Sequence, residues 1–458
     1  MDTGSPLIKQ RHLSDFDVSS HSVDFISKLP DEVLSHILSY FTTKQAVATS
    51  ILSKRWEYLW TLTTNLDFSD QIRCNYSDKN ECNTKLRSFK DFVDRVIFYH
   101  GESIIRKCHL HFYTYQVSPN IYSWVCAVIT CNIQELSIEG SSFELQQLPW
   151  RLFTCKSLVV LKISGMFMLD LPTHICYPFL KILRLDGVLY MSDASMDRLF
   201  SSCPVLEELE VIRRRGDGVG IMKINVPLLK RLTIHCGVYS YECKHKTLLN
   251  TPCLEYLKLT GNTSGGYSMN CSSSLVEARI HHGCDLDLLN GIAGVQHLVL
   301  TGKIMSDLRS IIEDHGLPTF NNLKKLELYV GKPVDWESLP DLLECSPNLE
   351  VLVFPEGLVV PKESGRDYYR FYWHQPDSVA ECLLHHLKQV EIFNFVGLPG
   401  ELYLVEYLLE YGEVLECMNI HCFDFSTRPR MRKKMEGVID EVSSFERSSS
   451  TCELVFFN

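Results

Sequence analysis

Hydrophobic residues in the segment 27–60 recur at the three- and four-residue spacing of α-helices. The first apolar stripe comprises Val33, Leu34, Ile37, Leu38 and Phe41. Pro30 precedes this stripe at a position suited to the first turn of a helix, and the helix dipole favours the carboxylates that follow it. We predict a second short helix capped by Thr43 and a third that carries Trp56 and Trp60. Three short helices cannot cover this much apolar surface among themselves, so a partner is expected there.

From about residue 105 onward the pattern changes to apolar pairs two residues apart, as in short strands. Proline precedes a leucine-rich pair in CPVLEELEV (203–211), VPLLKRLTI (226–234), TPCLEYLKL (251–259) and SPNLEVLVF (346–354). The first residues of the pairs are Leu110, Leu136, Leu161, Leu183, Leu209, Leu232, Leu257, Ala278, Leu298, Leu326, Leu352, Val390 and Met418. Eleven of their twelve gaps are 20–28 residues long, which is the period of leucine-rich repeats. The pattern predicts a solenoid with parallel strands on its concave face.

The helical segment resembles the F-box. That family begins with leucine-proline-aspartate-glutamate, continues with isoleucine-leucine, and ends with serine-x-arginine-tryptophan. The matching positions are Leu29, Pro30, Asp31, Glu32, Ile37, Leu38, Leu52, Ser53, Arg55 and Trp56. Plant members usually carry proline where this chain has Thr42, so we expect a looser turn there. The alternative interpretation is an ordinary helical hairpin packed on its own domain.

The resemblance implies that this segment docks on a Skp-type linker protein, which in turn binds a cullin scaffold carrying the ubiquitin-transfer machinery. The residues predicted at that interface are Leu29, Pro30, Leu34, Ile37, Leu38, Leu52 and Trp56. A buried leucine contributes roughly 1.5 to 3 kcal/mol, so a few of them would suffice for binding. Some of these side chains are also candidates for holding the helices together.

The C-terminal region resembles the FBD domain of plant F-box proteins. A gap of 38 residues before Val390 and an aromatic-rich stretch at 361–376 mark the boundary. The matching positions are Glu381, Cys382, Leu383, Lys388, Val390, Glu391, Ile392 and Gly397. Ala380 replaces the usual proline. We interpret this module as a cap on the solenoid, and the whole chain as similar to plant F-box/FBD/leucine-rich-repeat proteins.

The sequence therefore predicts an α/β chain with an N-terminal three-helix F-box, an irregular leucine-rich-repeat solenoid with its parallel strands on the concave face, and a C-terminal FBD cap. The expected boundaries are a flexible leader at 1–21, the F-box at 22–68, the repeats at 105–360 and the FBD domain at 375–458. The leader lacks a continuous apolar core, so we do not expect a secretory signal.

Polar residues beside the strands form the candidate substrate-binding surface. They are Glu208, Lys230, Arg231, Glu255, Lys258 and Lys324. A solvated face without a ligand is the alternative for each of them. The glycine-rich insertions at 213–220 and 261–270 are predicted to be mobile and to contact the substrate.

Composition narrows the function classes. The net charge of −11 disfavours non-specific binding to nucleic acid or to an anionic membrane, and no apolar run is long enough to span a bilayer. The 18 cysteines are expected to be free thiols in a reducing compartment. The chain has no C-x-x-C, H-E-x-x-H or phosphate-binding glycine motif, and its tightest His/Cys cluster, His281, His282 and Cys284, has no convincing metal spacing.

Two function hypotheses follow from these observations. The first is a non-catalytic adaptor of a Skp–cullin–F-box ubiquitin ligase in which the repeats select a protein substrate, with no catalytic residues, metal or cofactor. The second is a binding scaffold outside any ligase, whose repeats hold a protein or a ligand. The nucleus and the cytoplasm are both open as locations.

Overall fold

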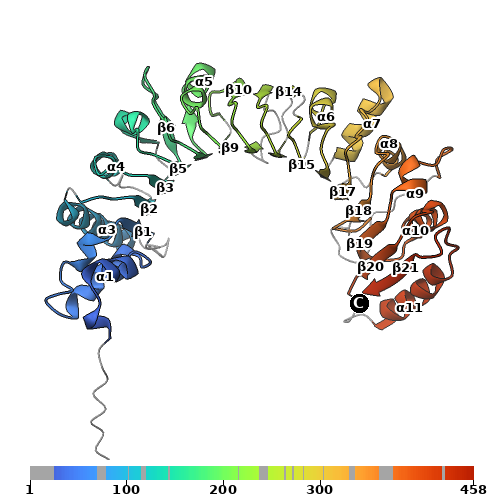
Figure 1. Ribbon diagram of the computed structural model, residues 1–458, viewed down its shortest axis with the longest axis horizontal. Helices are drawn as coiled ribbons and strands as arrows, with labels where there is room; N and C mark the ends of the chain where they lie inside the picture. The colour runs from blue at the N-terminus through green and yellow to red at the C-terminus, as the bar shows by residue number, and fades with distance from the viewer. Residues whose placement is uncertain are drawn as a thin grey trace, which may run out of the picture.

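The chain folds into an open arc, with its N-terminal helices at one end and its C-terminal strands at the other (Figure 1). The computed structural model describes residues 25–69, 79–101, 103–114, 120–142, 145–214, 216–236, 246–261, 265–270, 273–281, 283–302, 304–329, 336–359, 375–424 and 429–457. The predicted leader at 1–21 and most of the aromatic stretch at 361–376 lie outside these ranges.

Strands from successive repeats form one continuous parallel sheet along the inner side of the arc (Figure 1). In spatial order its fifteen strands within the described ranges are β1 (Asn65–Phe68), β2 (Lys107–Thr114), β3 (Glu135–Ser142), β5 (Val160–Gly165), β7 (Ile182–Asp186), β9 (Glu208–Arg213), β11 (Arg231–Cys236), β13 (Tyr256–Thr260), β15 (Glu277–His281), β16 (His297–Thr301), β17 (Lys325–Leu328), β18 (Val351–Phe354), β19 (Gln389–Phe395), β20 (Cys417–Cys422) and β21 (Glu453–Phe457). The solenoid with concave parallel strands is therefore confirmed.

Helices and short strands cover the outer side of the arc (Figure 1). The helices are α3 (Lys79–His100), α4 (Ile121–Ile129), η4 (Trp150–Thr154), α5 (Asp193–Ser201), α6 (Leu286–Ile292), α7 (Ile304–His315), α8 (Leu339–Glu344), α9 (Glu381–His385), α10 (Pro399–Tyr411) and α11 (Pro429–Ser443). Two three-stranded sheets join them, one of β4 (Gln146–Gln147), β6 (Phe167–Leu169) and β8 (Leu189–Tyr190), the other of β10 (Ile221–Asn225), β12 (Lys246–Asn250) and β14 (Tyr267–Met269).

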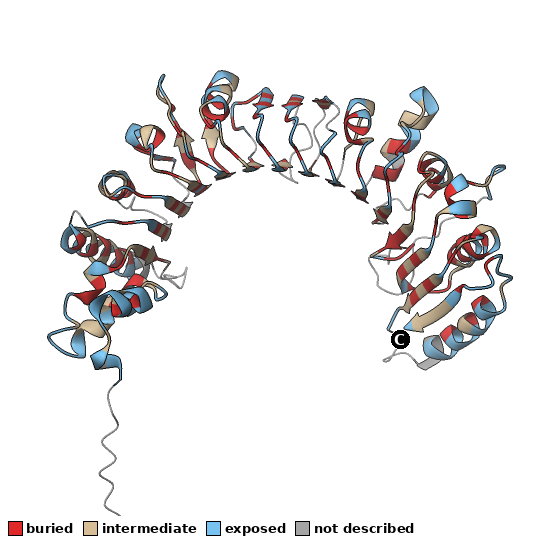
Figure 2. Cartoon of the chain, in the orientation of Figure 1, coloured by how far each residue is buried: buried red, intermediate tan, exposed pale blue. Residues whose placement is uncertain are grey.

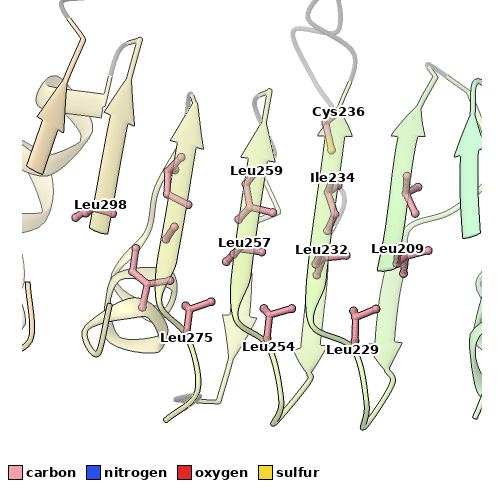
Figure 3. Packing of buried hydrophobic residues seen from close by; sticks show 14 of the residues in the cluster. Leu209, Leu229, Leu232, Ile234, Cys236, Leu254, Leu257, Leu259, Leu275 and Leu298 are labelled. Carbon is pink, nitrogen blue, oxygen red and sulfur yellow. The ribbon is translucent and has the colours of Figure 1, made fainter. Parts of the chain in front are cut away.

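The core is a ladder of apolar side chains in which each strand contributes one residue at the same register. Leu209, Leu232 and Leu257 lie side by side on neighbouring strands, and Figure 3 shows them in line. The residue two positions later, such as Ile234, is buried as well, while the residues between alternate to the exposed side (Figure 2). This alternation follows from the two-residue period of a strand.

The observed sheet differs from the predicted repeat pattern in three details. The residue of β2 that aligns with the ladder is Cys108, which pairs with Leu136, so the predicted marker Leu110 was wrong by two positions. The sheet also extends beyond the predicted repeats at both ends. β1 adds Leu66 before the first marker, and β21 adds Leu454 after the last one, because each pairs in register with its neighbour.

The insertion at 213–220 is more ordered than its glycines indicated. Arg213 and Asp217 form an ion pair whose two shortest contacts are both 2.7 Å, and their side chains are 2 % and 0 % exposed. Arg213 also donates to the Val219 carbonyl at 2.8 Å. The prediction of a mobile, substrate-contacting insertion was therefore wrong at Arg213, because this side chain is buried and its charge is paired inside the chain.

Candidate interaction surfaces

The N-terminal module comprises η1 (Ile26–Lys28), α1 (Asp31–Leu38), α2 (Thr43–Ala48), η2 (Thr49–Ile51) and η3 (Leu59–Leu62). The predicted third helix is thus only a short 3₁₀ segment, and Trp56 lies in the turn before it. β1 follows η3 almost directly. Only two residues separate Leu62 of η3 from Asn65 of β1, so the module is joined closely to the solenoid sheet.

Thr42, and not Thr43, caps the second helix. The Gln45 amide donates to Thr42 Oγ1 at 3.4 Å, and the Thr42 amide donates to Gln45 Oε1 at 3.1 Å, which completes a capping box. Thr43 is buried, and its hydroxyl accepts the Asp67 amide of β1 at 2.8 Å. The expected loosening of this turn stays a prediction, and the capping box stabilises the start of α2 in the absence of the proline.

The predicted linker-interface residues divide into three groups by burial. Leu34 and Leu38 are buried in the chain's own core and so support the surface from within. Pro30, Ile37 and Leu52 are exposed, with 40 % of Ile37 and 64 % of Leu52 accessible. Leu29 and Trp56 are half-buried and pack against the core.

Several exposed apolar residues of this module were not predicted as contacts. Ile51 is 88 % exposed. The others, on η1, α1, η3 and the turns, are Phe25, Ile26, Val33, Tyr40, Phe41, Tyr58 and Leu62. Soluble chains rarely expose so many large apolar side chains in so short a segment unless a partner covers them.

The six predicted substrate-binding residues lie on two different surfaces. Glu208, Arg231 and Lys258 belong to strands of the concave face. There Arg231 pairs in register with Glu208 and stacks on the ring of Tyr256, 4.2 Å from its centroid. Burial lowers the pKa of the neighbouring His235, and the charge of Lys258 lowers it further.

Lys230, Glu255 and Lys324 instead precede their strands. They lie on the edge of the solenoid where the strands begin, which we call the starting rim. Lys230 contacts Glu207 at 3.4 Å, and Lys324 forms an ion pair with Glu350. The backbone amides of Lys230 and Glu255 each donate to the residue at the same position of the preceding repeat, at 2.9 Å. The structure thus separates one predicted surface into two.

Histidines paired with carboxylates recur along the concave face. His109 Nδ1 lies 3.4 Å from Asp67, and this contact raises the pKa of His109 and lowers that of Asp67. At the other end His421 is stacked between Phe393 and Phe457, with ring centroids 4.1 and 4.5 Å away. Within the described residues no three His, Cys, Asp or Glu side chains are arranged to hold a metal, and no helix is long and apolar enough to cross a membrane.

Comparisons with known proteins match this architecture along nearly the whole chain. Three family profiles match in order: the F-box domain at residues 26–74, the LRR repeats of FBD-associated F-box protein At5g56370 at 121–354, and FBD at 375–420. FBD-associated F-box protein At4g10400 of Arabidopsis thaliana is 33 % identical over 444 residues, which cover 95 % of this chain and all of the relative. The chain belongs to the F-box/FBD/LRR-repeat family.

Other Arabidopsis thaliana members of the F-box/FBD/LRR-repeat family are similar to the same extent. FBD-associated F-box protein At5g56370 is 31 % identical, and the match covers 95 % of this chain and all of the relative. F-box/FBD/LRR-repeat protein At5g56420 is also 31 % identical, over 94 % of this chain and 99 % of the relative. F-box proteins in general act as substrate adaptors of Skp–cullin–F-box ligases, and the exposed apolar helices lie within the segment that matches the F-box domain.

The FBD segment of this F-box/FBD/LRR-repeat chain completes the arc. α9, β19, α10 and β20 continue the strand–helix alternation, and β21 ends the sheet. Ala380, which stands where the family usually has proline, precedes α9 with φ −62° and ψ 137°, a conformation that proline also adopts. The departure from the family pattern therefore leaves the local backbone unchanged.

Proposed function

We propose that this chain is a non-catalytic adaptor of a Skp–cullin–F-box ubiquitin ligase. In this proposal the N-terminal module docks on a Skp-type linker protein, and the solenoid holds a protein substrate. The cullin-bound machinery supplies the chemistry. Holding a substrate lysine near a charged ubiquitin carrier raises its effective concentration, so the adaptor needs no acid, base or nucleophile of its own.

One observation carries the proposal: the N-terminal helices expose a dense apolar surface on a well-packed base. Ile37, Ile51 and Leu52 are exposed, while Leu34 and Leu38 anchor the same helices from inside. A preformed surface loses little backbone conformational entropy on binding, because the helices that carry it are already held by the core. We propose Pro30, Ile37, Ile51 and Leu52 as direct contacts, with Leu29 and Trp56 at the margin.

The test is co-purification of the full chain with a Skp-type linker and a cullin. Ile37→Asp with Leu52→Asp places two carboxylates in the proposed contact, and we expect capture to be lost. Tyr403→Asp on α10 places a carboxylate at an exposed aromatic position far from the proposed contact and should leave capture intact. Circular dichroism of each variant separates loss of contact from loss of folding.

Capture of the folded intact chain that the double variant abolishes would support the adaptor role. Failure of the folded intact chain to bind any Skp-type linker would overturn it and favour a scaffold that acts outside the ligase. Equal capture of the double variant would instead overturn the assigned contact surface.

A further inference from the structure

We propose that a groove on the starting rim binds an amphipathic helix of a protein partner, a helix whose apolar stripe is flanked by acidic residues. The groove spans six repeats and has a volume of about 810 Å³. Its lining has two rows, the turn residues Asn132, Ser157, Phe179, Val205, Leu228 and Cys253, and the residues two positions later in five of these repeats, Gln134, Val159, Lys181, Glu207 and Lys230. This site is separate from the concave face and from the N-terminal module.

The floor of the groove is apolar although it faces solvent. Phe179 is 62 % exposed and Leu228 is 47 % exposed, and the half-buried Val205 lies in the repeat between them. Figure 3 shows Leu229 and Leu254 at equivalent places in the turns before their strands, and both are buried. In the sequence they directly follow the groove residues Leu228 and Cys253. The folded core is therefore satisfied without these outer side chains, which leaves them available to a partner.

The charged side of the groove carries an excess positive charge. Glu207 is shared by two ammonium groups, with Lys181 at 2.8 Å and Lys230 at 3.4 Å. The hydrogen bond from Lys181 and the two positive charges lower the pKa of Glu207, so this carboxylate stays ionised. Two lysines against one glutamate leave a net charge of +1 on a chain whose overall charge is −11. An acidic flank on the ligand complements this local charge.

Backbone hydrogen bonding excludes an added strand along this row. The carbonyl of Lys181 already accepts the amides of Glu207 and Glu208, each at 2.9 Å, and the carbonyl of Glu207 accepts those of Lys230 and Arg231. A ligand must therefore be recognised by side chains. Adjacent strands are about 4.8 Å apart, and a helix rises about 5.4 Å per turn. A helix with apolar residues at i, i+4 and i+7 would therefore place one of them opposite each of Phe179, Val205 and Leu228.

The experiment uses the full chain and a displayed library of helical peptides. Each peptide carries fixed leucines at i, i+4 and i+7, and its flanking positions are randomised. We expect selection to enrich glutamate and aspartate on one flank. Leu228→Ser should weaken binding of the enriched peptides at least about tenfold, as expected for removing one central apolar contact. Lys162→Glu on the concave face of β5 is a matched charge control that should not change the affinity.

A charge exchange tests the pairing directly. Lys181→Glu with Lys230→Glu should abolish binding of the acidic peptides and restore it for peptides in which the flanking acids are replaced by lysine. Cys253, which is exposed at one end of the groove, reports occupancy, because a bound peptide should slow its alkylation in a peptide-mapped mass-spectrometric assay.

Three results would overturn the inference: no enrichment of an acidic flank, equal binding to the Leu228 variant, or an unchanged alkylation rate at Cys253 with peptide bound. None of them depends on linker capture, so the groove and the adaptor role succeed or fail separately. Binding lost in the Lys162 control would place the peptide on the concave face and would also reject the groove.

Discussion

Arg55 reaches across 24 residues to the start of α1, where its Nη2 lies 2.6 Å and its Nε 2.9 Å from Asp31 Oδ1. The same guanidinium donates to the Leu29 carbonyl. It therefore ties the turn that carries Leu52 and Trp56 to the first residues of the leading helix. Two exposed parts of the proposed linker surface are held in register by one side chain.

Loss of this tie should affect linker binding more than stability. The pair is half exposed, so Arg55→Ala is expected to reduce the free energy of unfolding by about 1 kcal/mol or less. We expect the affinity for the Skp-type linker to fall several-fold, because the turn is no longer fixed against α1. Calorimetry and denaturant titration measure the two effects. Arg55→Lys should rescue little, since lysine cannot make both contacts.

The capping box at Thr42 predicts a helix-specific effect. Thr42→Ala removes the side-chain acceptor of the Gln45 amide and should destabilise α2 by about 1 kcal/mol. Hydrogen exchange should accelerate in α2 and remain unchanged in α10. Thr42→Pro introduces the residue usual in plant relatives; φ of −60° at this site accommodates the ring, but both hydrogen bonds of the capping box are lost. Faster exchange throughout the chain would contradict a local cap.

Breaking the buried pair of Arg213 and Asp217 should be costly. Asp217→Ala leaves a buried guanidinium without its carboxylate and is expected to destabilise the chain by about 3 to 5 kcal/mol. Arg213→Met combined with Asp217→Leu should recover much of that loss. Glu135→Ala, which breaks the exposed pair with Lys107, is the matched control with an expected effect below about 1 kcal/mol. Denaturant midpoints decide between these values.

Glu401 predicts a pH dependence. Burial raises its pKa to about 7, although the amides of Leu398 and Val396 donate to its carboxylate and oppose this shift. Because the folded pKa exceeds the unfolded value, the folded chain binds more protons, and the stabilisation present at low pH is lost as the pH rises from about 4.5 through about 7. The stability of the wild-type chain should therefore fall relative to that of Glu401→Gln over this interval.

Denaturant unfolding of both chains at pH 5 and pH 8 measures this difference. Equal pH slopes for the two chains would show that Glu401 has the same protonation in the folded and unfolded states. The variant Glu406→Gln on the same helix changes an exposed carboxylate and serves as the control.

The features of the fold that depend on a periodic hydrophobic pattern could be predicted from the sequence. The ladder from Leu136 to Met418 and the first helix with Leu34 and Leu38 follow from spacing alone, because burial of one face imposes the repeat. Exposure was harder to predict. Nothing in the local pattern distinguishes the buried Leu38 from the exposed Leu52, since both are leucines at apolar positions and only packing of the neighbouring turns separates them.

Which side chains pair with one another could also not be predicted from the sequence. Arg213 begins an insertion that its glycines predicted to be mobile, but the turn at Gly216 brings Asp217 back to pair with it. Likewise Lys230 and Arg231 are adjacent in sequence but lie on different surfaces, because the chain changes from a turn to a strand between them. Residues just before a strand lie on the starting rim, and outward-facing residues within the strand lie on the concave face. A difference of one position in the sequence therefore decides which surface a side chain occupies.

β1 connects the N-terminal module, which is proposed to dock on the linker, with the sheet: it pairs with β2, and the Asp67 amide donates to the Thr43 hydroxyl. Each strand therefore lies at a set distance from the end of the chain that is proposed to bind the Skp-type linker protein. Each added or deleted repeat would move everything beyond it by about one strand spacing, roughly 4.8 Å, and turn it by the local curvature. The number of repeats, more than any single residue, sets where a bound protein meets the ubiquitin carrier in the proposed ligase.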